Sequence, residues 1–183
     1  MKDLIILTND PSFTAWGWAV LDGRGEIKAI GCIKTAPEHK KTRIRVSDDR
    51  TRRTIEIVQE LLRVIAKYKI NYIVSESPHG SQNASAAVMI GIVAGILATV
   101  GECLQIPVEY YSEQDSKKAV LGRKAATKEA MIEAIDRVYN VAWQRVKYFD
   151  EAVADALAVH YVASRQSQML KMMRQDQPTM TRR

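Results

Sequence analysis

The chain has 183 residues, and 46% of them are hydrophobic, which fits one domain with a buried core and leaves no need for a second. The formal net charge of +6 favours a polyanionic partner. Cys32 and Cys103 form no CxxC pair, which argues against a disulfide framework or a zinc site and favours a reducing, cytosolic setting. The N-terminal stretch is too short and too quickly polar for a signal peptide.

The first predicted elements are strands. Residues 4–7 are an apolar run typical of a buried strand, and a second run covers residues 15–21, so the two predict a hairpin. Residues 26–34 alternate well enough to predict a third antiparallel strand. Asp10 lies where the first strand ends, immediately before Pro11. It is either a turn-capping residue or a metal ligand.

Residues 43–67 carry apolar side chains at helical spacing and predict a long helix. The start of this segment is strongly basic. Two interpretations stand side by side: a phosphate-binding stripe, or a solvated helix face partly neutralised by Asp48 and Asp49. The basic residues are Lys40, Lys41, Arg43, Arg45, Arg50, Arg52 and Arg53.

The middle of the chain alternates strands and helices. Residues 71–76 predict a short buried strand, the second to end in an acid, Glu76. Residues 84–101 are nearly uncharged but fall short of the roughly 20 apolar residues that a membrane span needs. We therefore expect a buried helix whose small residues allow close packing on a sheet, on a helix or across a dimer axis. Residues 106–110 predict a fifth strand, which gives an α/β fold with a mixed sheet.

The last part of the chain is predicted to be helical. Ser112 and Asp115 form a capping box for a short helix, and Thr127 can cap the helix that follows. Lys128 would then lie in a first turn, where the helix dipole disfavours a cation, so we interpret it as a residue that serves a ligand. Residues 149–165 predict a final helix, which ends a domain over residues 1–165 before a basic tail over 166–183.

Four acids stand out by position: Asp10, Glu76, Glu151 and Asp155. The spacing of Glu151 and Asp155 puts both carboxylates on one helical face, about 5–6 Å apart at Cβ. Hard oxygen ligands of this kind select magnesium or manganese over zinc. Two ions held roughly 3.5–4 Å apart would activate a water molecule and stabilise the leaving oxygen of a phosphodiester. The alternative is an exposed acidic first turn that favours the helix dipole.

Together these residues resemble the RuvC family of Holliday junction resolvases, which share the ribonuclease H-like fold. The resemblance covers nearly the whole chain up to about residue 160, and the motifs occur in order at the right spacing. The matching segments are Asp10-Pro11-Ser12 followed by GWAV, GCIKT at residues 31–35, VSE at 74–76 with Asn83 seven residues on, ADALA at 154–158, and Lys117 and Lys128 with a Val-x-Gly turn between them.

The resemblance implies a five-stranded mixed sheet, an antiparallel meander followed by parallel strands, flanked by helices. It also implies a metal-dependent endonuclease, working as a homodimer, that nicks two opposed strands of a four-way DNA junction in recombination and repair. Asp10, Glu76 and Asp155 would bind the metal, with Mg2+ as the expected cofactor, two ions per active site and Mn2+ able to substitute. Lys117 and Lys128 would contact phosphate near the cut, and the long apolar helix would lie at or near the dimer contact. We expect a cytoplasmic, nucleoid-associated protein, or one in the host cytoplasm if the source is viral, and no membrane partner.

The sequence departs from the family at two positions. A further Asp or His usually lies three residues before the last acid, and here that residue is Ala152. Glu151 would replace it as the fourth ligand, with Asp150 as the alternative. His79 stands where the best-known members have an aromatic residue that enters the junction; it either stacks on a base or is an ordinary loop histidine. We expect His39 and His160 at the surface.

Two other functions are compatible with this sequence. One is a structure-selective or RNA-directed nuclease on the same fold, since the acids specify chemistry and not substrate shape. The other is a non-catalytic DNA-binding module whose acidic cluster has decayed at Ala152. A nucleotide-binding fold of the actin and sugar-kinase kind would need two domains and glycine-rich phosphate loops, whereas this chain is short and has nine glycines.

Overall fold

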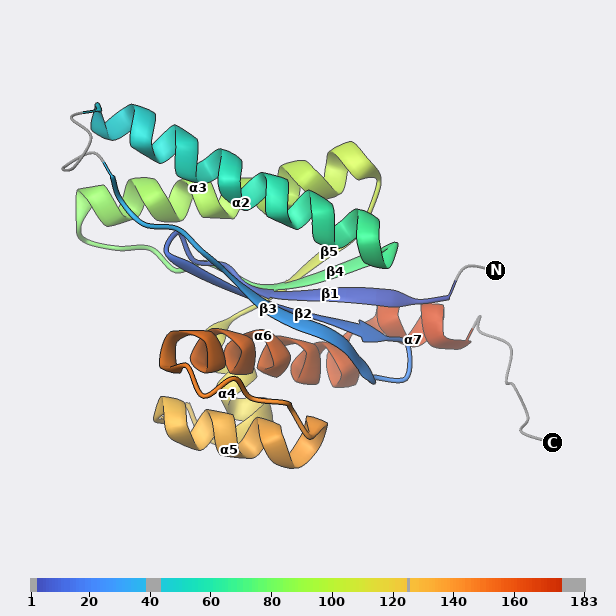
Figure 1. Ribbon diagram of the computed structural model, residues 1–183. Helices are drawn as coiled ribbons and strands as arrows, with labels where there is room; N and C mark the ends of the chain where they lie inside the picture. The colour runs from blue at the N-terminus through green and yellow to red at the C-terminus, as the bar shows by residue number, and fades with distance from the viewer. Residues whose placement is uncertain (1–2, 39–43, 125, 176–183) are drawn as a thin grey trace.

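A five-stranded mixed sheet forms the centre of the computed structural model, which describes residues 3–38, 44–124 and 126–175 (Figure 1). The chain begins with an antiparallel meander, in which β1 pairs with β2 and β2 with β3. Strand β4 then pairs with β1 in parallel, and β5 with β4, giving the order β3-β2-β1-β4-β5. The predicted sheet is thereby confirmed. Its strands are β1 (Ile5–Asp10), β2 (Ala15–Asp22), β3 (Ile27–Lys34), β4 (Tyr72–Glu76) and β5 (Val108–Tyr111).

The register of the three parallel strands brings their C-terminal ends to one edge of the sheet. Asn9 of β1 pairs with Ser75 of β4, so Asp10 and Glu76 follow at neighbouring positions. Glu76 in turn pairs with Tyr111, the last residue of β5. In an open sheet of this kind, ligands bind beyond the carboxyl ends of the parallel strands.

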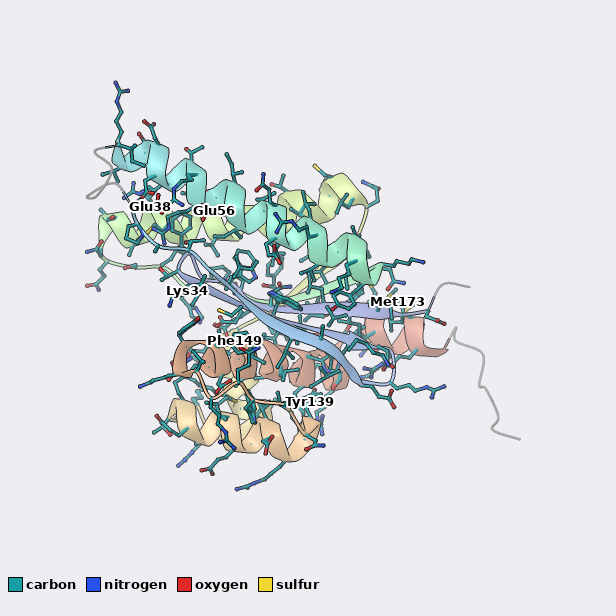
Figure 2. The ribbon with its side chains drawn as sticks, viewed as in Figure 1. Lys34, Glu38, Glu56, Tyr139, Phe149 and Met173 are labelled. Atoms are coloured by element: carbon teal, nitrogen blue, oxygen red, sulfur yellow. The ribbon has the colours of Figure 1, made fainter. Side chains whose placement is uncertain are left out.

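Helices cover both faces of the sheet (Figure 1). On one face lie α2 (Val46–Tyr68) and α3 (Ala84–Leu104), whose buried side chains pack with those of β1 and β2 in one core cluster. On the other face lies α6 (Lys147–Gln166), with α4 (Glu113–Leu121) and α5 (Lys128–Tyr139) packed against it. Figure 2 shows side chains filling the space on both faces, including Phe149 and Tyr139, which belong to the cluster around α6.

Helix α6 lies unusually close to the sheet because small residues face each other there. A Cβ added at Gly17 of β2 would come within 2.1 Å of the Ala152 carbonyl oxygen, so this position requires glycine. The hydroxyl of Thr8 in β1 also donates a hydrogen bond to the carbonyl of Ala156, at 2.5 Å. These contacts fix the middle of α6, and with it Asp155, against the end of β1.

Helix α3 differs from the expected buried helix. It is long and apolar enough to cross a membrane by length and composition, yet only 28% of its most apolar stretch is buried in the structure. Val93, Ile96 and Leu97 face the core, whereas a Cβ at Gly91 or Gly95 would meet no atom within 4 Å. Because apolar residues surround the whole helix, the sequence alone does not distinguish its packed face from its open one.

Two arginines of α2, Arg52 and Arg53, hold neighbouring parts of the fold together through hydrogen bonds. Arg53 is 5% exposed and donates hydrogen bonds to the hydroxyl of Thr35 and the carbonyl of Phe13, both at 2.8 Å. Arg52 donates to Asp49 at 2.7 Å and to the carbonyl of Ala36 at 2.8 Å. For these two residues the structure favours a structural role over phosphate binding. Lys40, Lys41, Arg43 and His39 lie outside the described residues.

The C-terminal region differs from the prediction at His160 and has one more helix than was predicted. The prediction that His160 lies at the surface is wrong: it is 2% exposed, and its Nδ1 is 2.7 Å from the hydroxyl of Tyr139. The short helix α7 (Gln168–Gln175) packs its fully buried Leu170 beside β1 and β4. The division into a domain over 1–165 and a tail over 166–183 stays a prediction, and residues 176–183 lie outside the described part.

Candidate active site

Asp10 and Glu76 lie at the ends of two neighbouring parallel strands. In the turn after β1, the hydroxyl of Ser12 accepts the backbone N–H groups of Thr14 and Ala15, both at 3.4 Å. Ser12 therefore caps the turn, which was one of the two roles considered for Asp10 in the sequence. Asp10 is left at the strand end as an acid available for chemistry.

Asp155 comes from the other face of the sheet, on α6, and is 9% exposed. Its Oδ2 accepts a hydrogen bond from the ammonium of Lys128, the first residue of α5. The predicted cap of this helix is confirmed, because the Thr127 hydroxyl accepts the N–H of Ala130 at 3.2 Å. The cap fixes where α5 begins. The helix dipole disfavours a cation in the first turn, and the contact of Lys128 with the Asp155 carboxylate explains why a cation is nevertheless found there.

The three acids act on one another electrostatically, although they lie far apart in the sequence. Burial, followed by the charge of Asp155, raises the pKa of Asp10 to about 7. Burial, followed by the charges of Asp10 and Asp155, raises the pKa of Glu76 to about 8. Burial also raises the pKa of Asp155, against the opposing effect of Lys128. Carboxylates that repel one another in a partly buried site favour either protonation or a bound cation.

The chemistry of this donor set fits a hard divalent cation, since it offers carboxylate oxygens and neither thiolate nor imidazole. In the described parts of the chain, no three Asp, Glu, His or Cys side chains are close enough together, as they stand, to hold one ion. Lys128 supplies the positive charge at Asp155 instead. Burial lowers the pKa of Lys128, but the combined attraction of Asp155, Asp10 and Glu76 raises it above its ordinary value. Binding of one cation by all three acids would therefore require Asp155 to release this ammonium.

The residues proposed for the fourth acid lie beside Asp155 on α6. Glu151 is half-buried and its Oε1 is 3.9 Å from the ammonium of Lys147. Asp150 is 8% exposed and accepts the backbone N–H of Gln144 at 3.1 Å, which gives it a structural task. Ala152, where the resemblance led us to expect an Asp or His, is buried against Gly17.

Another acid, Glu113, reaches the same edge and was not predicted as a site residue. It is the first residue of α4, and its charge raises the pKa of Asp10, Glu76 and Asp155. Its side chain accepts a hydrogen bond from Lys117 and lies 3.6 Å from Nε2 of His79. The fifth strand ends two residues before Glu113, and this signal in the sequence would have placed it at the same edge as Asp10 and Glu76.

Comparisons with known proteins find relatives that cover most of this chain. A family model described as "Crossover junction endodeoxyribonuclease RuvC" matches residues 6–162. The chain is 30% identical over 169 residues to the RuvC protein of Idiomarina loihiensis, covering 91% of this chain and 90% of that protein. It is 26% identical over 152 residues to the RuvC protein of Ehrlichia canis, covering 83% of this chain and 93% of the relative.

Two solved structures share the fold. Thermus thermophilus RuvC in complex with a Holliday junction substrate has a TM-score of 0.68 and 18% identity, covering 88% of this chain and 95% of the other. The yeast mitochondrial Holliday junction resolvase has a TM-score of 0.62 and 13% identity, covering 93% of this chain and 81% of the other. The predicted ribonuclease H-like fold is confirmed. From the match over residues 6–162, the chain belongs to the RuvC family of crossover junction endodeoxyribonucleases.

Proposed function

We propose that this chain is a metal-dependent endonuclease that resolves four-way DNA junctions by hydrolysing a phosphodiester bond in each of two opposed strands. The observation that carries the proposal is the meeting of Asp10, Glu76 and Asp155 at one sheet edge, in a chain that belongs to a junction endonuclease family. The formal net charge of +6 supports a DNA substrate. Recombination and DNA repair are the processes in which such a junction arises.

Asp10, Glu76 and Asp155 are the residues that would hold the catalytic cations, with Asp10 and Glu76 sharing one ion and Asp155, with Glu151, holding the other. We propose Mg2+, two ions per active site, with Mn2+ able to substitute, because carboxylate oxygens suit both. When bound, such ions activate a water molecule and stabilise the leaving oxygen of a phosphodiester. The partial burial of the carboxylates limits competition from water for the cation. Lys128, once it leaves Asp155, would have its ammonium available for a phosphate oxygen, and Lys117 would contact phosphate from α4.

The fourth acid stays a prediction. Glu151 lies one helical turn before Asp155, as the sequence indicated, and its side chain pairs with an exposed lysine that a cation would be able to displace. Titration calorimetry with Mg2+ on the Glu151→Gln protein tests this assignment. We expect weaker binding than in the wild type if Glu151 is a ligand, and unchanged binding if it is not.

A homodimer is the proposed working form, because a four-way junction presents two opposed strands for cleavage. The open apolar side of α3, where a Cβ added at Gly91 or Gly95 would meet no atom of a neighbouring element within 4 Å, supports a dimer contact on this helix. The cytoplasm, in contact with DNA, is the proposed location.

Cleavage assays on three substrates test the proposal. With Mg2+, we expect the purified protein to nick a labelled, mobile four-way junction much faster than a flap or an RNA–DNA hybrid. The Asp10→Asn protein should bind the junction normally but not cut it, because binding depends on lysine and arginine contacts with phosphate. Faster cleavage of the flap or the hybrid would indicate another nuclease on the same fold. Normal cleavage by Asp10→Asn would refute the site.

A further inference from the structure

Glu113 is held in a fixed position beside the proposed active site. The backbone N–H of Ser77, the residue after Glu76, donates a hydrogen bond to the carbonyl of Tyr111 at 2.8 Å. The capping box of Ser112 and Asp115 then fixes the first turn of α4, with the Ser112 hydroxyl 3.1 Å from the N–H of Asp115. The start of α4 is thus tied to the strand end that carries Glu76.

The two carboxylate oxygens of Glu113 face two basic side chains from different segments. Oε1 accepts a hydrogen bond from Lys117, four residues along α4. Oε2 lies 3.6 Å from Nε2 of His79, in the loop that follows β4. His79 and Lys117 have side chains that are 52% and 20% exposed, so both are accessible from solvent. A single carboxylate therefore joins the two basic groups that flank this edge of the sheet.

Glu113 is charged at neutral pH, because the hydrogen bond from Lys117 lowers the pKa of its carboxyl group. A negative charge at a surface that faces DNA weakens binding to phosphate. It also occupies the ammonium of Lys117, which would otherwise be free to pair with the backbone. A flexible lysine that must contact one particular phosphate near a reacting centre gains from being held in place, because small misplacements slow catalysis.

We infer that Glu113 is a positioning residue, which holds Lys117 and His79 in the orientation needed for cleavage at some cost in junction affinity. This inference rests on the proposed function. It assigns Glu113 no contact with the cation or with the reacting phosphate. Its consequence is a separation of two measurable quantities: removal of the carboxylate should tighten DNA binding and slow the cleavage step. Loss of folding, by contrast, would weaken DNA binding and slow cleavage.

Two variants separate the charge of Glu113 from its geometry. Glu113→Gln removes the charge, and we expect roughly two- to fivefold tighter junction binding. The plot of log Kd against log salt should also steepen by about 0.9, because Lys117 becomes free to neutralise one more phosphate. Cleavage in a single turnover should slow by about tenfold or more. Glu113→Asp keeps the charge on a shorter side chain that cannot reach both partners, so its affinity should stay within about twofold of the wild type while cleavage slows.

The measurements use a fluorescent four-way junction, with anisotropy in EDTA for affinity and Mg2+ for single-turnover cleavage. Glu133→Gln is the matched control, since it removes one carboxylate from an exposed pair with Arg137 on α5, and both quantities should equal those of the wild type. Melting temperatures without DNA show whether each variant is folded. If Glu113→Gln unfolds, Glu113→Asp still tests the positioning role.

The inference is overturned if Glu113→Gln cleaves at the wild-type rate, or if it both binds more weakly and cleaves more slowly. A normal rate in Glu113→Asp would also overturn it, because the geometry would then be irrelevant. The Asp10→Asn protein distinguishes this failure from failure of the proposed function. An inactive Asp10→Asn beside a fully active Glu113→Gln refutes the positioning role alone, whereas an active Asp10→Asn refutes the site itself.

Discussion

Asp10→Asn should stabilise the folded protein while abolishing cleavage, because the structure holds Asp10 in a site that disfavours its charge. The rise in the pKa of Asp10 from 3.8 to about 7 has burial as its largest cause and the charge of Asp155 as the next. Such a rise corresponds to about 4 kcal/mol of unfavourable free energy for the ionised form in the native state. Partial solvent exposure of Asp10 and sharing of this cost with Glu76 and Asp155 reduce the gain from Asn to about 1–3 kcal/mol.

The sign of the pH dependence follows from the direction of the pKa change. The native state binds the Asp10 proton more tightly than the unfolded state does, so wild-type stability falls as pH rises between about 4 and 7. Near pH 4 the native state is protonated and the unfolded state is about half ionised, so the variant should differ little from the wild type. The advantage of Asn should grow up to about pH 7 and then stay constant.

Urea unfolding in EDTA at a series of pH values between about 4 and 8.5 measures this difference. A repeat with Mg2+ should shrink it, because a bound cation would compensate the carboxylate charges of the wild type. Equal stability of the two proteins at pH 8 in EDTA would refute the reasoning. A difference that is independent of pH would refute it as well, since the effect would then come from packing.

Three further predictions concern the same edge of the sheet. Glu76→Gln should also stabilise the metal-free protein, with the gain increasing up to about pH 8, as measured by urea unfolding, and should bind junctions without cutting them. Lys128→Ala should bind Mn2+ several-fold more tightly than the wild type in titration calorimetry, because the Lys128 ammonium competes with the cation for Asp155. The variant should nevertheless cleave more slowly. Weaker Mn2+ binding would contradict this prediction. Gly17→Ala should lower the free energy of unfolding by about 1–3 kcal/mol, because its methyl group would overlap the Ala152 carbonyl, and an unchanged denaturation midpoint would show that α6 can move.

The sequence was most informative where chemistry coincides with the end of a secondary structure element. Asp10 and Glu76 were identifiable because each closes a short apolar strand, and parallel strands bring their ends together. Lys128 was identifiable as a cation in an unfavourable first turn, and its contact with Asp155 explains that position. The family resemblance added the order of these motifs and the ribonuclease H-like topology.

The features that the sequence did not reveal depend on long-range packing. Glu113 was not singled out in the sequence, because nothing local indicates that its side chain, which pairs with Lys117 on the same helix, also reaches His79 in the loop after β4. His160 was expected at the surface, yet it is buried on α6 with its ring beside that of Tyr139, since a single polar residue does not reveal which face of a helix is buried. Helix α3 was expected to be buried against the sheet, a helix or a dimer axis, and the sequence did not reveal which side stays open, because its hydrophobic residues extend around the entire helix.

The central claim is that Asp10, Glu76 and Asp155 together bind the pair of catalytic cations. Crystals soaked in Mn2+ and measured at the manganese absorption edge test this claim most directly, because the anomalous signal locates the ion without reference to activity. We predict two peaks that between them contact carboxylate oxygens of all three residues, with the ammonium of Lys128 moved away from Asp155. A fully occupied Mn2+ site elsewhere on the protein, with Lys128 still bonded to Asp155, would contradict it.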